Sequence, residues 1–166
     1  MTNRDLSTTV DRDTFRHALR SVASSVAVIT TCHEGHLHGM TATAFSSVCA
    51  DPPTVLIVVN QSTRSHPLIS DSRAFVVNFL SQDQRHLGDF FSAKTDDQFD
   101  SVAFTRGRNG CPIIDGAAAY LDCETISESV CGTHTVFLAR VVGAFGANLS
   151  PLLYHNGAYR IVGDAA

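Results

Sequence analysis

The 166-residue chain lacks the glycine patterns that mark nucleotide-binding domains. Its 11 glycines include no Gly-x-Gly-x-x-Gly fingerprint after a strand and no Walker-type phosphate loop. A separate dinucleotide-binding domain of the doubly wound type is therefore excluded. If the chain binds a dinucleotide, that molecule must therefore use a site that also serves another ligand.

Long hydrophobic runs, paired cysteines and basic clusters are also missing. No run approaches bilayer length, and residues 1–7 contain no apolar region of the signal-peptide kind. The five cysteines form no Cys-x-x-Cys pair and cannot all be bridged, which favours reduced thiols used for packing. The formal net charge of −4 disfavours nucleic acid and anionic membranes as partners. We expect a cytoplasmic protein.

The composition predicts one domain with a hydrophobic core. Hydrophobic residues make up 44% of the chain and charged residues 17%, which is a globular balance. No linker or low-complexity tract divides the sequence. We therefore expect a single domain over residues 1–166, with residues 1–10 as a flexible N-terminal tail.

Hydrophobic patterns predict a chain made mainly of strands. The strands follow one another too closely for the crossovers that parallel sheets need, so we expect antiparallel pairing. The pair Asn156-Gly157 lies between two short apolar runs and is a strong hairpin signal. Strands are predicted over residues 26–31, 54–60, 74–80, 119–126, 135–142, 152–154 and 159–162.

Three helices are predicted from capping residues and apolar spacing. Residues 11–23 carry Phe15, Leu19 and Val22 near helical spacing, with acidic residues at the favourable amino end. A short helix is expected near Pro67. Ser81 and Gln84 form a capping box before a third, amphipathic helix.

The run GMTATAFSSV at residues 39–48 is the most informative stretch of the chain. Four small hydroxyl residues crowd into seven positions, which is too polar for a core strand and too β-branched for a helix. Such a segment brings hydroxyl and amide donors close to a ligand rich in acceptors, and a flavin is such a ligand. A Ser/Thr-rich edge strand facing water is the alternative interpretation.

Several motifs in one order resemble the short-chain flavin reductases. After the run at 39–48 come Asp-Pro-Pro at 51–53, Val-Val-Asn at 58–60, Phe-Val-Val-Asn-Phe-Leu-Ser at 75–81 and Gly-Thr-His-Thr at 132–135. The resemblance extends from about Phe15 to Arg160. Members of this family are the reductase components of two-component flavin monooxygenases, such as 4-hydroxyphenylacetate and phenol hydroxylases.

The resemblance implies both a fold and an activity. The implied fold is mainly β, an antiparallel split β-barrel of the FMN-binding, Greek-key type with peripheral helices, usually a homodimer. The implied enzyme is an NAD(P)H-dependent flavin reductase that reduces FMN or FAD with NADH or NADPH and supplies a separate oxygenase. The nicotinamide must then share the flavin pocket.

For the flavin, the resemblance implies contacts along the run at 39–48 and along the segment that follows residue 60. Phe91 is a further candidate that could lie against the flavin, although core packing is the more frequent explanation of an aromatic at helical spacing. Asn78, Leu80 and Ser81 lead a neighbouring strand toward the same pocket. Arg64 is the sharpest physical candidate, because a guanidinium holds a phosphate by two parallel bonds. The implied cofactor-binding residues are Met40, Thr41, Ala42, Thr43, Ser46, Ser47, Asn60, Ser62, Arg64, Ser65 and Phe91.

His134 is the predicted catalytic residue among eight histidines. It precedes a strand-like segment, so we expect it at the rim of the fold between two hydroxyl residues that fix its tautomer. In the resembling family, a histidine in this motif lies beside the nicotinamide. Many relatives carry Gly-Asp-His there. This chain has Thr133 where those relatives have an aspartate, so His134 has no acidic neighbour in the motif. The motif therefore gives no support to a role that needs a charged imidazole.

Four other interpretations remain open at this point. Residues 32–38 hold Cys32 and three histidines and could bind zinc or copper, but no second ligand cluster follows at finger spacing, so we expect no metal. A hydrolase triad would use Ser127 or Ser129 without a nucleophile elbow. A non-catalytic flavin-binding barrel or a self-contained flavoprotein oxidase would use the same flavin site.

Overall fold

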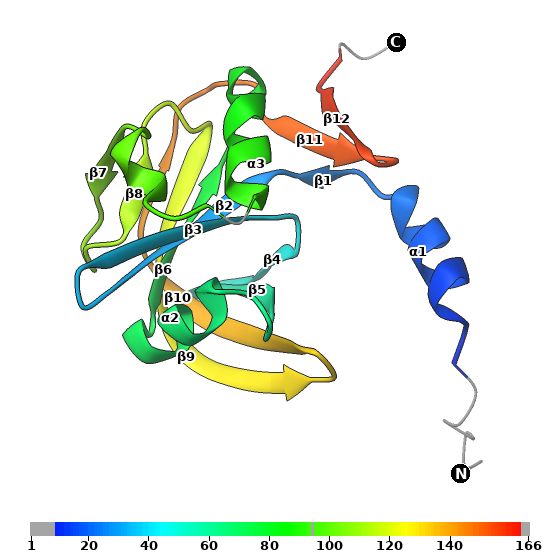
Figure 1. Ribbon diagram of the computed structural model, residues 1–166, viewed down its shortest axis with the longest axis horizontal. Coiled ribbons are helices and arrows are strands. Elements are labelled where there is room, and N and C mark those ends of the chain that lie inside the picture. Colours follow the sequence, from blue (N-terminus) through cyan, green and yellow to red (C-terminus); the bar gives the residue numbers. More distant parts are fainter. Residues whose placement is uncertain (1–8, 94, 164–166) are drawn as a thin grey trace.

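A seven-stranded antiparallel sheet forms the body of the protein in the computed structural model, which describes residues 9–93 and 95–163. Its strands lie in the order β3-β2-β6-β9-β10-β5-β4. A sheet of β1, β11 and β12 and a pair formed by β7 and β8 lie beside it (Figure 1). The predicted mainly β, antiparallel fold class is confirmed. Of the predicted tail, residues 1–8 lie outside the described residues.

The elements alternate between short helices and strands joined by tight turns. The helices are α1 Arg12–Arg20, α2 Ser65–Ser72, α3 Arg85–Ser92 and the single-turn η1 Gln82–Gln84 and η2 Gln98–Asp100. The strands are β1 Ser24–Ser25, β2 Ala27–His33, β3 His36–Ala42, β4 Phe45–Ala50, β5 Pro53–Asn60, β6 Ala74–Phe79, β7 Phe104–Arg106, β8 Pro112–Ile114, β9 Ala119–Cys131, β10 His134–Gly146, β11 Leu152–His155 and β12 Ala158–Ile161.

The main sheet is strongly curved. In a flat sheet, β6 and β4 would be four strand spacings apart, or about 19 Å. The ring centroids of Phe79 on β6 and Phe45 on β4 instead lie 4.9 Å apart, edge to face. The outermost strands β3 and β4 are also joined directly through Thr43 and Ala44. The two edges of the sheet therefore meet at this link.

The concave side of the sheet holds the larger of the cores. Ile29, Ile57, Phe75 and Phe137 are at most 1% exposed and pack together with Ile69 of α2. Each such side chain contributes about 1.5–3 kcal/mol on full burial, so this cluster is the main source of stability. Through Ile69, the helix α2 packs against the concave side of the sheet, and the loop that precedes α2 is held there with it.

A second core covers the other side of β2. Val26 and Val28 alternate with the concave-side residues and pack against Leu80, Phe91 of α3 and Leu152 of β11. The strand β2 is therefore buried on both faces, which is why its sequence is a continuous apolar and threonine run without alternation. The helix α3 is fixed above β3 by the same cluster (Figure 1).

Buried polar groups attach the β7–β8 pair to the main sheet. Asn78 of β6 donates from Nδ2 to the Val28 carbonyl at 3.2 Å and accepts from the Ile114 amide at 2.8 Å. Thr30 donates from its hydroxyl to the Pro112 carbonyl. These strands have only three residues each and were not predicted, because their pairing depends on such long-range bonds.

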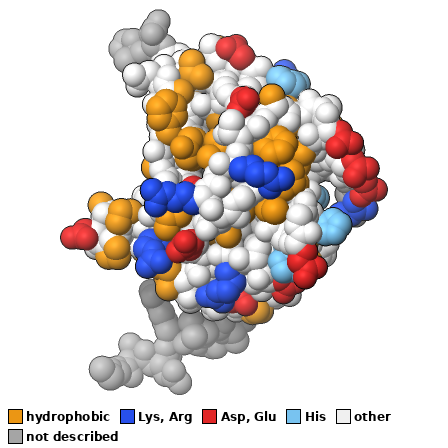
Figure 2. Space-filling view, turned by 90° about the vertical axis from the view of Figure 1, so that its left-hand side faces the viewer, with side chains coloured by type: hydrophobic (Ala, Val, Ile, Leu, Met, Phe, Trp, Pro, Cys, Tyr) orange, Lys and Arg blue, Asp and Glu red, His pale blue; other side chains and the backbone are white. Residues whose placement is uncertain are grey.

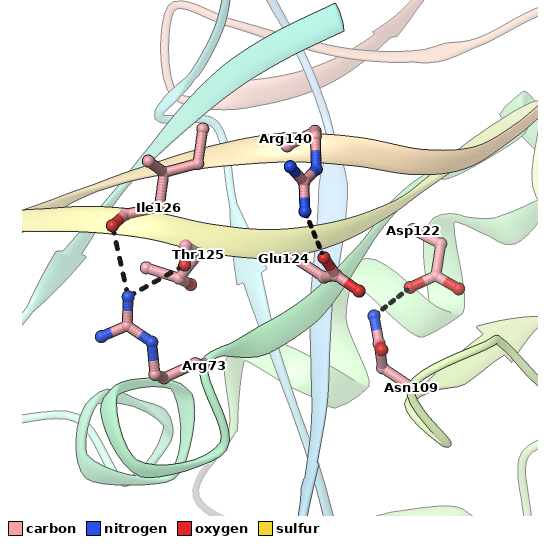
Figure 3. A network of polar contacts seen from close by, with 7 residues as sticks. All are labelled: Arg73, Asn109, Asp122, Glu124, Thr125, Ile126 and Arg140. Atoms are coloured by element: carbon pink, nitrogen blue, oxygen red, sulfur yellow. Dashed lines mark hydrogen bonds and ion pairs between the residues drawn. The ribbon is translucent and has the colours of Figure 1, made fainter.

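Further polar contacts involve residues of β9, the strand next to β6 in the sheet (Figure 3). Arg73, which ends α2 with φ of +54°, donates from Nη2 to the Thr125 carbonyl at 3.0 Å and to the Ile126 carbonyl at 3.2 Å. Arg140 pairs with Glu124 across β9 and β10 at 2.9 Å. The buried Asp122 accepts from the Arg108 amide at 2.7 Å and holds the turn before β8. This network is structural.

Most predicted elements are confirmed, with three corrections. The predicted cradle run at 39–48 is two strands, β3 and β4, at opposite edges of the sheet. The predicted strands 119–126 and 135–142 are the first parts of longer strands, β9 and β10, which continue to Cys131 and Gly146. The third helix begins as the turn η1, where the Ser81 amide donates to Gln84 Oε1 at 3.1 Å, and α3 follows.

The first helix is present but buries no residue. Phe15, Leu19 and Val22 of the predicted apolar face are 55%, 52% and 57% exposed. In Figure 1, α1 stands to one side of the body, next to β1 and β11. Asp11 caps it by accepting from the Asp13 and Thr14 amides at 3.0 Å each. No helix in the described parts of the chain is long and apolar enough to cross a membrane.

The expected packing role of the cysteines holds for only part of the set. Cys111 and Cys123 are fully buried, and burial raises their thiol pKa values to about 11 and about 12. Cys49 and Cys131 are exposed, so the predicted packing role is wrong for these two. All five are free thiols.

The Asn78 network gives a test of the fold. We expect Asn78→Ala to lower the free energy of unfolding by about 2–4 kcal/mol, because it leaves the buried Ile114 amide without its partner. Asn109→Ala, which removes one 3.4 Å bond to Asp122 near the surface, is the matched control and should cost below about 1 kcal/mol. Urea denaturation of the two variants beside wild type measures the difference, and equal losses would contradict the assigned role of Asn78.

Candidate functional site

The link between β3 and β4 lies at the same end of the sheet as the start of β10. The Phe45 amide donates to the Thr43 carbonyl and the Val58 amide to the Ala44 carbonyl, both at 3.1 Å. Two residues beyond Val58, Asn60 ends β5 and pairs with His134, the first residue of β10. The fold therefore gathers three predicted segments that are far apart in the sequence.

Strand register places several predicted residues on the convex face of β4, β5 and β10, which we call the outer face. Directly opposed residues of antiparallel strands share a face, and here the opposed pairs are Ser46 with Leu56 and Asn60 with His134. Their neighbours Ile57 and Val59 point into the core and are fully buried. The outer face consists of Ser46, Leu56, Val58, Asn60, His134, Val136 and Leu138.

Half-buried aliphatic side chains lie between the polar ends of this face. Val58 pairs with Val136 and Leu56 with Leu138, and all four are only partly covered. A flat apolar strip with Ser46 at one edge and with Asn60 and His134 at one end suits a planar ring that carries polar atoms on its rim. Ser47 does not join this face, because it stands opposite the inward-pointing Val55.

His134 lies at the strand rim, as predicted. Its Nδ1 is 2.9 Å from the Thr133 hydroxyl, and the Thr133 carbonyl accepts from the Gln61 amide at 3.0 Å. If that hydroxyl donates, Nδ1 is the acceptor and the proton of a neutral ring is on Nε2. The imidazole is partly exposed and so can present an N–H group to a ligand.

Residues 60–65 form a hydrogen-bonded turn that leads into α2. Asn60 Oδ1 accepts from the Ser62 amide at 2.9 Å and from its hydroxyl at 2.8 Å, and the Asn60 carbonyl accepts from Thr63 Oγ1 at 2.8 Å. The Asn60 amide oxygen is thus committed to the turn. Ser65 Oγ at the first position of α2 is buried and has no hydrogen-bond partner among the described residues.

Arg64, the predicted phosphate ligand, lies immediately before α2. Its guanidinium forms an ion pair with Asp96, and the two side chains are 54% and 79% exposed. An exposed pair of this kind is weak, so the guanidinium remains available to an anion. The helix amino end adds a partial positive charge at the same place.

Thr41, Ala42 and Thr43 line a cleft of about 560 Å³ under α3 and the β11–β12 hairpin. Thr41 Oγ1 donates to the Gly88 carbonyl of α3 at 2.7 Å, so this hydroxyl is used within the chain. Met40 packs against the concave-side core. Ala42 also packs against this core, so Thr43 is the member of this predicted set whose side chain remains uncommitted at the cleft among the described residues.

The far wall of the cleft was missed by the sequence interpretation. Tyr159 of β12 packs against the Gly88 backbone, the Arg85 guanidinium lies 5.3 Å from its ring centroid, and Asp89 and Arg160 also line the cleft. Burial, followed by a hydrogen bond to Asp89, raises the pKa of Tyr159 to about 12. The Asn156-Gly157 hairpin signal predicted β12, but nothing local indicated what it would contact.

Several other candidates have structural roles. The Phe91 ring is 2% exposed, lies against Phe90 and Phe99, and fills the space above Gly39. The ring therefore has no open surface that a flavin could contact, and its predicted role in flavin binding stays a prediction. Asn78 is saturated by backbone groups, and Leu80 is fully buried.

Neither competing site is assembled in the described residues. No group of three or more His, Cys, Asp or Glu side chains is placed there to hold a metal ion, so residues 32–38 are a hairpin with histidines at its surface. Glu128 accepts from the Ser70 hydroxyl at 2.8 Å and so joins β9 to α2.

A family model decides the relationship of this chain to known proteins. The model of the flavin reductase like domain matches residues 19–163, which span the main sheet, the cleft and the outer face. The chain belongs to this family. The resemblance found in the motifs is confirmed.

Individual relatives cover most of the chain. It is 35% identical over 150 residues to the reductase component of a 4-nitrophenol 4-monooxygenase/4-nitrocatechol 2-monooxygenase from Rhodococcus opacus, covering 90% of this chain and 80% of that protein. It is 39% identical over 150 residues to the reductase component of an FADH₂-dependent resorcinol hydroxylase from a Rhizobium species, covering 87% and 84%.

A solved structure shares the fold closely. The NADH:FAD oxidoreductase SgcE6 of Streptomyces globisporus, in complex with NAD and FAD fragments, superposes with a TM-score of 0.89 at 31% identity. The similarity covers 96% of this chain and 99% of that one. This chain therefore shares its fold with a protein whose structure was solved in complex with NAD and FAD fragments.

Proposed function

We propose that this chain is an NAD(P)H-dependent flavin reductase that reduces FMN or FAD and supplies the reduced flavin to a separate monooxygenase. The observation that carries the proposal is the outer face, where Ser46, Asn60 and His134 surround an aliphatic strip, and Asn60 at its end begins the turn that leads to Arg64 and α2. The relatives named above are reductase components of two-component hydroxylating systems. The cytoplasmic location stays a prediction.

The residues present fit a flavin. The aliphatic strip would accept the planar ring, and the turn that follows Asn60, with the Ser62 hydroxyl and Arg64, would hold the ribityl phosphate. The Ser65 hydroxyl supports this fit, because a buried hydroxyl without a partner is costly unless a ligand engages it. Bound flavin would supply the hydride-accepting chemistry, and the protein would supply alignment.

His134 is the proposed positioning group for the nicotinamide. Hydride transfer needs no general base, so the role of a neutral imidazole is to donate or accept one hydrogen bond at the nicotinamide and to keep that ring in place. Thr133 fixes the orientation of the imidazole through the 2.9 Å contact to Nδ1. The cleft lined by Thr43, Tyr159 and Arg160 is the proposed place for the rest of the dinucleotide. The two nucleotides then share one continuous site.

The curvature of the main sheet is a feature of β-barrels. We propose that the sheet is the split β-barrel of Greek-key type, divided where β3 and β4 meet. The direct link through Thr43 and Ala44 and the Phe45–Phe79 contact support this proposal. The barrel edge would then lie at the flavin site.

The enzymatic activity is tested by steady-state oxidation of NADH. We expect oxidation to require added free FMN or FAD and to saturate with flavin, because a weakly held flavin behaves as a substrate. Flavin binding without NADH oxidation would instead favour a storage or sensor protein, and oxidation without added flavin by the purified apoprotein would contradict release.

The role of His134 is tested by His134→Ala. The variant should keep flavin affinity within about twofold while hydride transfer slows by about one to three orders of magnitude, which corresponds to about 1.4–4 kcal/mol of lost alignment. Stopped-flow flavin reduction and a flavin titration on the same preparation separate the two quantities. His36→Ala, at an exposed histidine in the β2–β3 hairpin, is the control. An unchanged reduction rate would remove His134 from the site.

We infer that the protein is a homodimer in which α1 packs on a second copy. The helix buries no residue in its own chain while Phe15 and Leu19 stay more than half exposed. An isologous partner would cover these side chains. The cleft between α1 and the β11–β12 hairpin also includes Thr43 and Ala44, so such an interface would lie next to the flavin site.

Light scattering tests the dimer and the helix together. The expected mass is about twice 17.8 kDa for wild type. Leu19→Glu should shift the mass toward the monomer, because it places a charge in the apolar contact, whereas His17→Glu on the same helix serves as the control. A fully active wild-type monomer at working concentration would refute the inference.

A further inference from the structure

The carboxylate of Asp96 faces the proposed phosphate ligand. Arg64 precedes α2, Asp96 lies between α3 and η2, and the two form an ion pair although the chain between them includes β6 and α3. Both side chains are mostly in solvent, so the pair contributes little to stability. A carboxylate that adds little to the fold, yet occupies the one guanidinium expected to hold the ligand, calls for a functional explanation.

The segment that carries Asp96 is firmly attached to β3. Gln98, two residues later, is 3% exposed and accepts from the Gly39 amide at 2.9 Å. The Phe99 ring packs between Phe91 and Phe104, with centroids 5.5 Å and 5.1 Å away. Asp96 is therefore held next to the turn at residues 60–65 by the buried residues that follow it.

His38 is a titratable group beside this pair. Burial, followed by the nearby charge of Arg64, lowers the pKa of His38, so its imidazole is neutral at pH 7. The charge of Asp96 acts on His38 in the direction that raises its pKa. The side chain of Gln98 is its hydrogen-bond partner. Arg64 and Asp96 thus form a locally neutral pair beside a neutral imidazole.

Figure 2 shows a face of the molecule on which acidic side chains and histidines gather along one side, near a basic side chain. A mixture of signs differs from the uniformly positive surface of a site that binds phosphate tightly. The carboxylate of Asp96 repels every negative charge that a ligand brings to Arg64, and this repulsion weakens binding. The repulsion is greatest for a phosphate monoester, which places nearly two charges on one phosphate at pH 7, and smaller for a diphosphate diester, whose two charges are divided between two phosphates.

We propose that Asp96 is a specificity-determining residue that competes with the flavin phosphate for Arg64, weakens the binding of phosphorylated flavins and disfavours FMN more than FAD. The inference rests on the proposed function, because it takes the flavin phosphate to lie at Arg64. For a reductase that must hand its product to another protein, this competition keeps the flavin exchangeable. Asp96 makes no contact with the reacting ring in this arrangement.

Titrations with riboflavin, FMN and FAD test the proposal, since riboflavin has the same ring and ribityl chain without phosphate. Asp96→Asn should lower the dissociation constant of FMN by about twofold to fivefold, the size expected for removing one exposed ion pair. The gain for FAD should be smaller, and riboflavin should bind as it does to wild type. Asp100→Asn removes a charge from the same segment and should give a smaller change for FMN than Asp96→Asn.

A double-mutant cycle identifies the competitor. Arg64→Ala should weaken FMN but not riboflavin, and in the Arg64→Ala background the gain from Asp96→Asn should shrink. Unchanged FMN binding in Asp96→Asn, or an equal gain for riboflavin, would overturn the proposed competition. Failure of wild type to bind any of the three flavins would reject the proposed function instead, so the two failures are distinguishable.

Discussion

The short connection between the two outermost strands is the constraint on which the rest of the structure depends. A flat sheet would separate β3 from β4 by six strand spacings, or about 29 Å, whereas a link of two residues spans at most about 11 Å. The sheet must therefore curve until its edges meet. The curvature creates the enclosed core of Ile29, Ile57 and Phe137, and it brings Thr43 beside the end of β5. The core and the binding site have the same geometric origin.

Local chemistry explains which elements could be predicted. Asn156 and Gly157 both have positive φ, +50° and +77°, as a two-residue hairpin turn requires, so the pair identified β11 and β12 from the sequence. The strands β7 and β8 carry no such signal, because Asn78 and Thr30 on distant strands provide their anchoring bonds. The second half of β9 is exposed and mixes polar with apolar side chains, and it is a strand because β10 supplies its partners.

The same division holds for the candidate site. The hydroxyl-rich run, the turn at Asn60 and the histidine motif are each recognisable as sequences, and the register of β5 against β10 brings Asn60 and His134 together. Asp96 and Tyr159 reach the site through tertiary packing alone, one beside Arg64 and the other against α3. The residues next to Asp96 and Tyr159 in the sequence form no recognisable motif, because the partners of these two side chains come from other parts of the fold. The run at residues 39–48 was the strongest signal in the sequence, but it did not indicate that β3 and β4 are separate strands joined at Thr43.

The order of strand pairing has a consequence for how the protein folds. The pairs β2–β3, β4–β5, β9–β10 and β11–β12 each join neighbours in the chain and can form early, whereas β10–β5 and β6–β9 close long loops. High contact order predicts slow folding, with these long-range pairings rate-limiting. Asn60 and His134 face each other only after β5 has paired with β10. A nascent or misfolded chain therefore has no assembled flavin site, and competence to bind flavin is acquired together with closure of the sheet.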